Sequence, residues 1–68
     1  MSKKGERAIY EVDDGHRGVR RITPELRDAV RIAKALSLGG TAVIWNNSDP
    51  KYMRVYRYGA FVPRSAHA

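Results

Sequence analysis

One stretch decides the fold class: residues 23–40, which read TPELRDAVRIAKALSLGG. Thr23 can cap the free N–H groups of a first helical turn, and Pro24 suits the first helical position. Placed at 100° per residue, the apolar side chains fall within an arc of about 160°. These side chains belong to Leu26, Ala29, Val30, Ile32, Ala33 and Leu36. The pattern predicts an amphipathic helix over residues 24–38 that ends at Gly39-Gly40, because glycine readily adopts the left-handed C-cap conformation.

Segments typical of strands lie on both sides of this helix. Before it, residues 8–12 and 19–22 are rich in strand-forming side chains, and Asp13-Asp14-Gly15 between them is a turn signal. After it, residues 41–45 are nearly all apolar, which predicts a central strand. Residues 46–50 have loop composition, residues 52–58 alternate as a strand does, and Phe61-Val62 can add a short last strand.

This order predicts the α+β class: a single antiparallel sheet of four to five strands with one helix packed on one face, in ββαββ order. We expect one domain over residues 8–63, a flexible basic arm at 1–7 and a disordered tail at 64–68. The helix is expected to cover the side of the sheet that carries Met53 and Val55. The other face should then be open, because the chain is too short to supply a second layer.

Composition narrows the function classes. The 68 residues include no cysteine, which excludes disulfides and thiolate metal sites and suits a reducing cytoplasm. No apolar run approaches the ~20 residues of a membrane span, and no apolar segment follows the basic start as in a signal peptide. The formal net charge is +6, and residues 16–68 carry ten Lys and Arg against three acids. Such a balance favours a polyanionic partner or an acidic protein surface.

The chain offers no set of residues for catalysis. Asp13-Asp14-Gly15-His16 reads as a turn, since a specific metal site needs three or four placed ligands. Gly39-Gly40-Thr41 follows a helix instead of preceding one, so it does not resemble a phosphate loop. With two histidines and no cysteine, no nucleophile with its base can be assembled. We therefore expect a protein that is not an enzyme and has no cofactor or metal.

The strongest candidate for a binding surface is the alternating row Tyr52-x-Arg54-x-Tyr56-x-Tyr58. On an open sheet face, such a row could stack on unpaired bases while Arg meets phosphate. It could equally anchor a protein interface, where Tyr and Arg are enriched. A third interpretation is structural, because cross-strand tyrosines stabilise sheets without any ligand, and the row could also face the core.

Two further groups of cations are candidates for contact with a partner or nucleic acid. Arg27, Arg31 and Lys34 fall within about 60° on the polar side of the helix. Their mutual repulsion suggests a partner, although such a stripe is often only a solvated face. Arg17, Arg20 and Arg21 flank Gly18, where the backbone could approach a phosphate closely. The alternative for that group is an edge strand protected by charge.

The helix run Ala29-Val30-Arg31-Ile32-Ala33-Lys34 leads through Gly40-Thr41-Ala42-Val43 into a strand, and a Tyr/Arg-rich strand follows. In size and order of elements, residues 22–61 resemble small phage-encoded anti-CRISPR proteins in which a helix packs on an antiparallel sheet. The resemblance implies a viral inhibitor that docks, in the host cytoplasm, on a CRISPR surveillance complex where nucleic acid would bind. No site residues follow from it, because it rests on layout and not on a motif.

The sequence therefore predicts a small non-catalytic binding protein of phage type that docks on a nucleic-acid-handling complex. The alternative is a protein that binds DNA or RNA directly, with little sequence preference. Since the chain is basic, an inhibitor of this kind would cover an acidic patch or compete for nucleic acid. A third, weaker interpretation is a homodimer that pairs edge strands.

Overall fold

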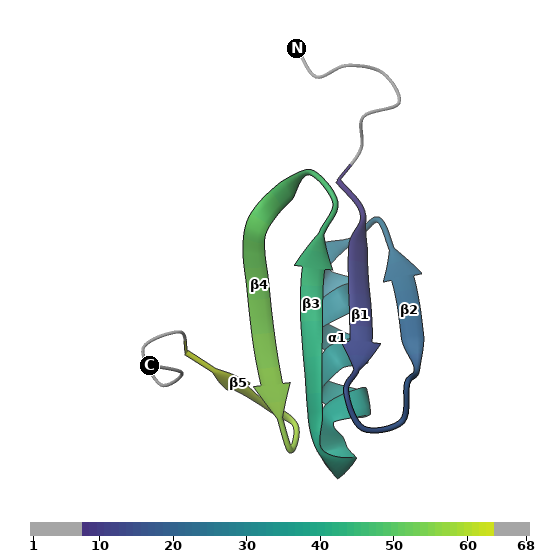
Figure 1. Ribbon diagram of the computed structural model, residues 1–68, viewed down its shortest axis with the longest axis vertical. Helices are drawn as coiled ribbons and strands as arrows, with labels where there is room; N and C mark the ends of the chain where they lie inside the picture. Colours follow the sequence, from purple (N-terminus) through teal and green to yellow (C-terminus); the bar gives the residue numbers. More distant parts are fainter. Residues whose placement is uncertain (1–7, 64–68) are drawn as a thin grey trace.

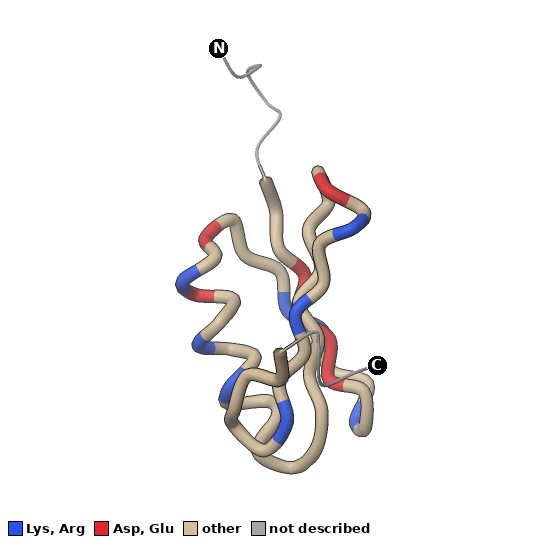
Figure 2. Tube along the Cα trace, turned by 90° about the vertical axis from the view of Figure 1, so that its left-hand side faces the viewer, with Lys and Arg blue, Asp and Glu red and all other residues tan. Residues whose placement is uncertain are grey.

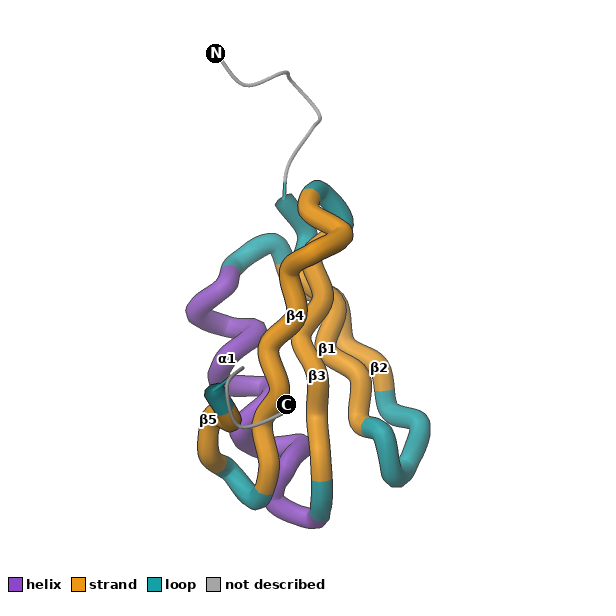
Figure 3. Tube along the Cα trace, turned by 60° about the vertical axis from the view of Figure 1, so that its left-hand side comes forward, coloured by secondary structure: helices purple, strands orange, loops and turns teal. Residues whose placement is uncertain are grey.

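A computed structural model describes residues 8–63, so the arm and the tail expected at 1–7 and 64–68 lie outside the described residues. The elements are β1 (Tyr10–Asp14), β2 (Arg20–Thr23), α1 (Leu26–Leu36), the 3-10 turn η1 (Ser37–Gly39), β3 (Thr41–Asn46), β4 (Asp49–Arg57) and β5 (Ala60–Val62). All strand pairs are antiparallel, and they form one five-stranded sheet in the order β2-β1-β3-β4-β5 (Figure 1). α1 lies on one side of that sheet (Figure 3). The predicted α+β architecture is confirmed.

The central place predicted for β3 is also confirmed, since β3 pairs with β1 on one side and with β4 on the other. β1 begins later than expected and includes Asp13-Asp14, which were predicted to form the turn. The carboxylate of Asp14 explains the shift. It accepts the backbone N–H groups of His16 and Arg17 at 2.9 and 3.1 Å, so the chain turns after Asp14 and not before it.

Both ends of α1 differ from their predicted form. Thr23 is paired with Tyr10 at the end of β2 and accepts the Glu25 N–H at 3.2 Å, while Glu25 itself is the N-cap. Because the sheet holds Thr23 as a strand residue, it cannot also occupy the cap position. At the other end, α1 tightens into η1, and Gly40 is extended with φ at 167°. The predicted left-handed glycine C-cap is therefore wrong.

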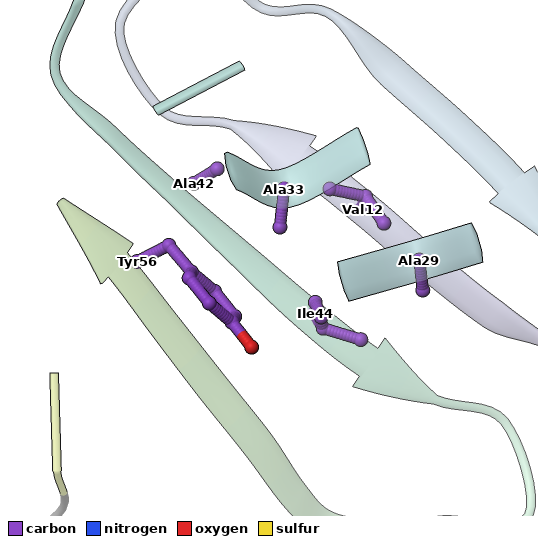
Figure 4. Packing of buried hydrophobic residues seen from close by; sticks show 6 residues of the cluster. All are labelled: Val12, Ala29, Ala33, Ala42, Ile44 and Tyr56. Carbon is purple, nitrogen blue, oxygen red and sulfur yellow. The ribbon is translucent and has the colours of Figure 1, made fainter. Parts of the chain in front are cut away.

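The core between helix and sheet is small. Within residues 8–63, six apolar residues are buried: Val12, Ala29, Ala33, Ala42, Ile44 and Tyr56. Figure 4 shows their side chains, from α1 and three strands, turned toward one another. Tyr10, Val30, Ile32, Leu36 and Tyr52 pack around them and remain partly exposed. The apolar side predicted for the helix is the side that it buries.

The sheet face that the helix covers is the opposite of the predicted one. Tyr56 is 3% exposed beneath α1, whereas Met53, which belongs to the other alternating row of β4, is 40% exposed on the opposite face. Volume explains the choice, because Ala29 and Ala33 on the helix and Ala42 opposite Tyr56 leave a space that only a large side chain fills. The expectation that the helix covers Met53 and Val55 is wrong.

Candidate nucleic-acid interface

The row from Tyr52 to Tyr58 is divided among three environments. Tyr56 lies in the core, and Tyr52 is half-buried with its ring edge-on to Tyr10, 5.8 Å between centroids. Burial raises the pKa of Tyr52, which is the behaviour of a desolvated phenol. Tyr58 is outside the strand, in the β4–β5 turn with φ at 50° and 72% exposed. The three rings therefore do not form the predicted stacking surface.

Of the members of the row that lie within β4, Arg54 is the one that is exposed and available to a ligand. Its side chain is exposed on the helix side of β4. The guanidinium carbon lies 5.5 Å from the centre of the Tyr52 ring and 5.6 Å from that of Phe61. Two cation–π contacts hold the group in one direction, and it has no carboxylate partner in residues 8–63.

Phe61 was missed as a candidate residue. It lies opposite Tyr56 in the β4–β5 register, and 47% of its side chain is exposed. Its place beside Arg54 depends on the pairing of a three-residue strand, which the alternation within β4 does not reveal. The exposed ring and the ordered guanidinium together present a flat apolar surface next to a fixed cation.

The basic stripe predicted on the helix is confirmed. Arg27, Arg31 and Lys34 are all exposed on the outer face of α1, where Figure 2 shows cationic positions spaced along the helix. Arg31 donates to Asp28 at 2.6 Å, and the other two have no carboxylate partner among the described residues. From Arg27 to Lys34 the stripe is about 10 Å long. A shallow, open hollow lies between the two arginines, with Asp28 at its side.

The predicted cluster of Arg17, Arg20 and Arg21 does not act as one group. Arg17 Nε contacts the Asp14 carboxylate at 3.2 Å. Arg20 Nε lies 3.2 Å from Glu11 and 3.4 Å from Asp13, on the open face of the sheet. Arg21 is paired with Val12, so its exposed side chain leaves β2 on the helix side. Gly18 has φ at 73°, a left-handed conformation that glycine readily adopts, and it lies in the turn between β1 and β2.

The unpaired positive charge is concentrated on one side of the molecule. Six cations of residues 8–63 have no ion-pair partner there: Arg21, Arg27, Lys34, Lys51, Arg54 and Arg57. Four of these, with Arg31, lie on the side of the sheet that carries α1. We call Arg21, Arg27, Arg31, Lys34 and Arg54 the helix-side basic surface.

The turn after β1 contains the one histidine of the described residues. His16 Nδ1 lies 2.6 Å from the buried Asp14 carboxylate, and its ring rests on Gly39 and Gly40. Burial would raise the pKa of Asp14, but the hydrogen bonds from His16 and Arg17 outweigh it and lower that pKa. These contacts tie the β1–β2 turn to the start of β3. In residues 8–63 no three His, Cys, Asp or Glu side chains are grouped to hold a metal ion.

Comparison with known proteins gives no family. No family model, curated protein or solved structure matches this chain. The resemblance to anti-CRISPR proteins therefore stays a prediction. Within residues 8–63, α1 is too short and too polar to cross a membrane. What the protein binds must accordingly be inferred from its surface.

Proposed function

We propose that this protein is a non-catalytic nucleic-acid-binding protein whose helix-side basic surface contacts phosphates with little sequence preference. The observation that carries the proposal is the placement of charge: five exposed cations lie on one side, and four of them have no carboxylate partner within residues 8–63. Proteins that neutralise phosphates in this way gain affinity by releasing counterions, whatever the base sequence.

The chemistry of the surface favours phosphate over a general anion. Four of its five cations are arginines. The planar guanidinium can donate two parallel hydrogen bonds to two oxygens of one phosphate. Arg54 adds pre-organisation, because Tyr52 and Phe61 already hold its direction before a ligand arrives. An unpaired base can stack on the exposed part of Phe61 while Arg54 meets its phosphate, so a single strand suits this surface better than a duplex.

Docking on a nucleic-acid-handling protein complex, such as a CRISPR surveillance complex, is the second candidate. The observation in its favour is that large apolar side chains are exposed near the end of β4: Leu38, Tyr58 and Phe61. Aromatic and Arg side chains together are the usual anchors of protein interfaces. In that case the same cations would cover an acidic patch of the complex.

Salt-titrated fluorescence anisotropy tests the first candidate. Labelled single-stranded DNA, single-stranded RNA and duplex DNA are titrated with the protein between roughly 50 and 200 mM salt. We expect affinity to fall steeply with salt and to be highest for a single strand. The variant Arg27→Gln/Arg54→Gln should reduce the slope of log K against log salt by about 1.4 to 1.8, since each lost phosphate contact removes ~0.7 to 0.9.

The matched control is Lys51→Gln/Arg57→Gln, which removes the same charge outside the helix-side basic surface. An equal effect of the two double variants would show that only net charge matters. Absence of binding to all three nucleic acids at roughly 50 mM salt would reject the proposal. Calorimetric titration of a purified surveillance complex with the protein then tests the second candidate, and absence of heat at two temperatures would reject that candidate as well.

A further inference from the structure

The face of the sheet opposite α1 carries a continuous apolar centre. On it Trp45 lies opposite Met53, and Val43 lies opposite Val55, across the β3–β4 pair. Trp45 and Met53 are each 40% exposed, and Ile22 on β2 is exposed further out on the same face. No second layer covers this face within residues 8–63. Exposed apolar patches of this kind mark interaction sites, and Trp is among the residues enriched as anchors in them.

The small core on the other side of the sheet predicts a domain with little stability to spare. Within residues 8–63 the buried apolar core has six members, and three of them are alanines. A chain of 68 residues buries only about 60% of the surface that it exposes when unfolded. Small domains without disulfides or a structural metal commonly gain stability by association. A partner on the open face would bury the largest apolar side chains that the core leaves out.

Charged side chains of opposite sign lie on the two sides of the apolar centre of the open face. Among residues 8–63, the one cation that contacts Glu11 and Asp13 of β1 is Arg20. The hydrogen bond to Asp13 and burial raise the pKa of Glu11, as expected for two carboxylates with too little positive charge. On the other side of β3, Arg57 lies opposite Thr41 on the same face and has no carboxylate partner in the described residues. Negative charge thus lies on one side of the apolar centre and positive charge on the other.

We propose that the open face is a homodimer interface, in which a two-fold axis parallel to β3 lays β1 of each copy over β4 of the other. This arrangement places Trp45 of the two copies together at the centre, with aligned sheets about 10 Å apart. Asp13 then lies within about 7 Å, along the strand direction, of the place where Arg57 of the second copy stands. A long guanidinium side chain spans that offset. A two-fold axis perpendicular to the strands would instead place Glu11 and Asp13 of one copy over the same residues of the other. Repulsion between these like charges disfavours that arrangement.

The dimer does not rest on the proposed function. α1 lies on the outer side of each sheet, so the helix-side basic surface remains free in the dimer. Nucleic-acid binding and self-association can therefore succeed or fail separately, and the dimer is tested without nucleic acid.

The protein contains a single tryptophan, and it lies at the proposed centre. Sedimentation velocity from low micromolar to near millimolar concentration should show conversion to a species of twice the 7.7 kDa chain mass. Over the same range, the emission of Trp45 should shift to shorter wavelength as the ring leaves water. A monomer at every concentration overturns the proposal, and a dimer with unchanged Trp45 emission overturns the choice of face.

Variants test the arrangement within the dimer. Trp45→Lys should raise the dissociation constant at least about tenfold, since the ring would be a central anchor. Asp13→Lys and Arg57→Glu should each weaken the dimer, and the two together should restore it by exchanging the charges. Arg27→Gln on the outer helix face is the control and should leave association unchanged. Circular dichroism melts confirm that each variant is folded, and failure of the double exchange to restore a folded protein to dimers overturns the arrangement.

Discussion

Two tyrosines of one alternating row should differ greatly in how much stability they lose on the same substitution. Tyr56 is 3% exposed between α1 and the sheet, and Tyr58, two positions on, is 72% exposed in a turn. Replacing Tyr56 by Ala removes an aromatic ring from the centre of the core. Replacing Tyr58 by Ala removes a ring that is mostly in water.

The sizes of the two effects follow from burial. Aromatic-to-alanine changes in a packed core cost about 3–5 kcal/mol, because transfer energy is lost and a cavity remains. Ala29, Ala33 and Ala42 around the ring are too small to fill that cavity by rotating, which favours the upper half of the range for Tyr56→Ala. Tyr58→Ala should stay within about 0.5 kcal/mol of the parent. A domain of this length has about 3–10 kcal/mol in total, so only the first change threatens folding.

Urea unfolding followed by circular dichroism measures both free energies of unfolding. If Tyr56→Ala is unfolded in buffer, Tyr56→Leu supplies the comparison, with an expected loss of about 1–3 kcal/mol and a melting temperature lower by about 4–24 °C. Equal costs for the Tyr56 and Tyr58 variants, or a greater cost for Met53→Ala than for Tyr56→Leu, would mean that the helix covers the other face and would refute the packing described above.

Two further changes probe the turns. Tyr58 has φ at 50°, a conformation that costs a residue other than glycine about 1–2 kcal/mol, so Tyr58→Gly should raise the melting temperature, and a fall would show that the turn is not strained. The pKa of Asp14 is lowered in the folded protein, so its contribution to stability is complete above the ordinary value of 3.8 and is lost as pH falls through the lower folded value. Asp14→Asn should therefore reduce stability at neutral pH and flatten acid unfolding below pH 4, and parallel unfolding curves for the two proteins would contradict this role.

Most of the architecture could be predicted from local patterns. The 3.6-residue spacing of small and branched apolar side chains identified the buried side of α1, and the apolar run of β3 identified the central strand. Boundaries were less predictable because long-range contacts set them. Thr23 has the chemistry of a cap, but its pairing with Tyr10 keeps it in β2. Asp14 has the chemistry of a turn, yet its carboxylate stabilises the turn from the last position of a strand.

The sheet face could not be decided from β4 alone. Both of its alternating rows contain apolar side chains, Met53 and Val55 on one and Tyr52 and Tyr56 on the other, so periodicity satisfies either choice. The deciding information lies in α1, where the two buried residues, Ala29 and Ala33, are small and leave room for a ring. With the face inverted, the candidate surface is the helix-side basic surface and not the tyrosine row. Its helix stripe was predictable, and so was Tyr52 beside Arg54, whereas the place of Phe61 beside Arg54 required the register of β5.

The contact of the His16 ring with Gly40 links two positions that are far apart in the chain. A methyl group on Gly40 would lie 2.6 Å from the ring nitrogen Nδ1, which is itself held by Asp14. Residue 40 is thus restricted by a turn that precedes it by an entire hairpin strand and a helix. Among variants that keep this fold, bulk gained at position 40 must be accommodated at position 16, by a shift of the His16 ring or by a smaller residue there.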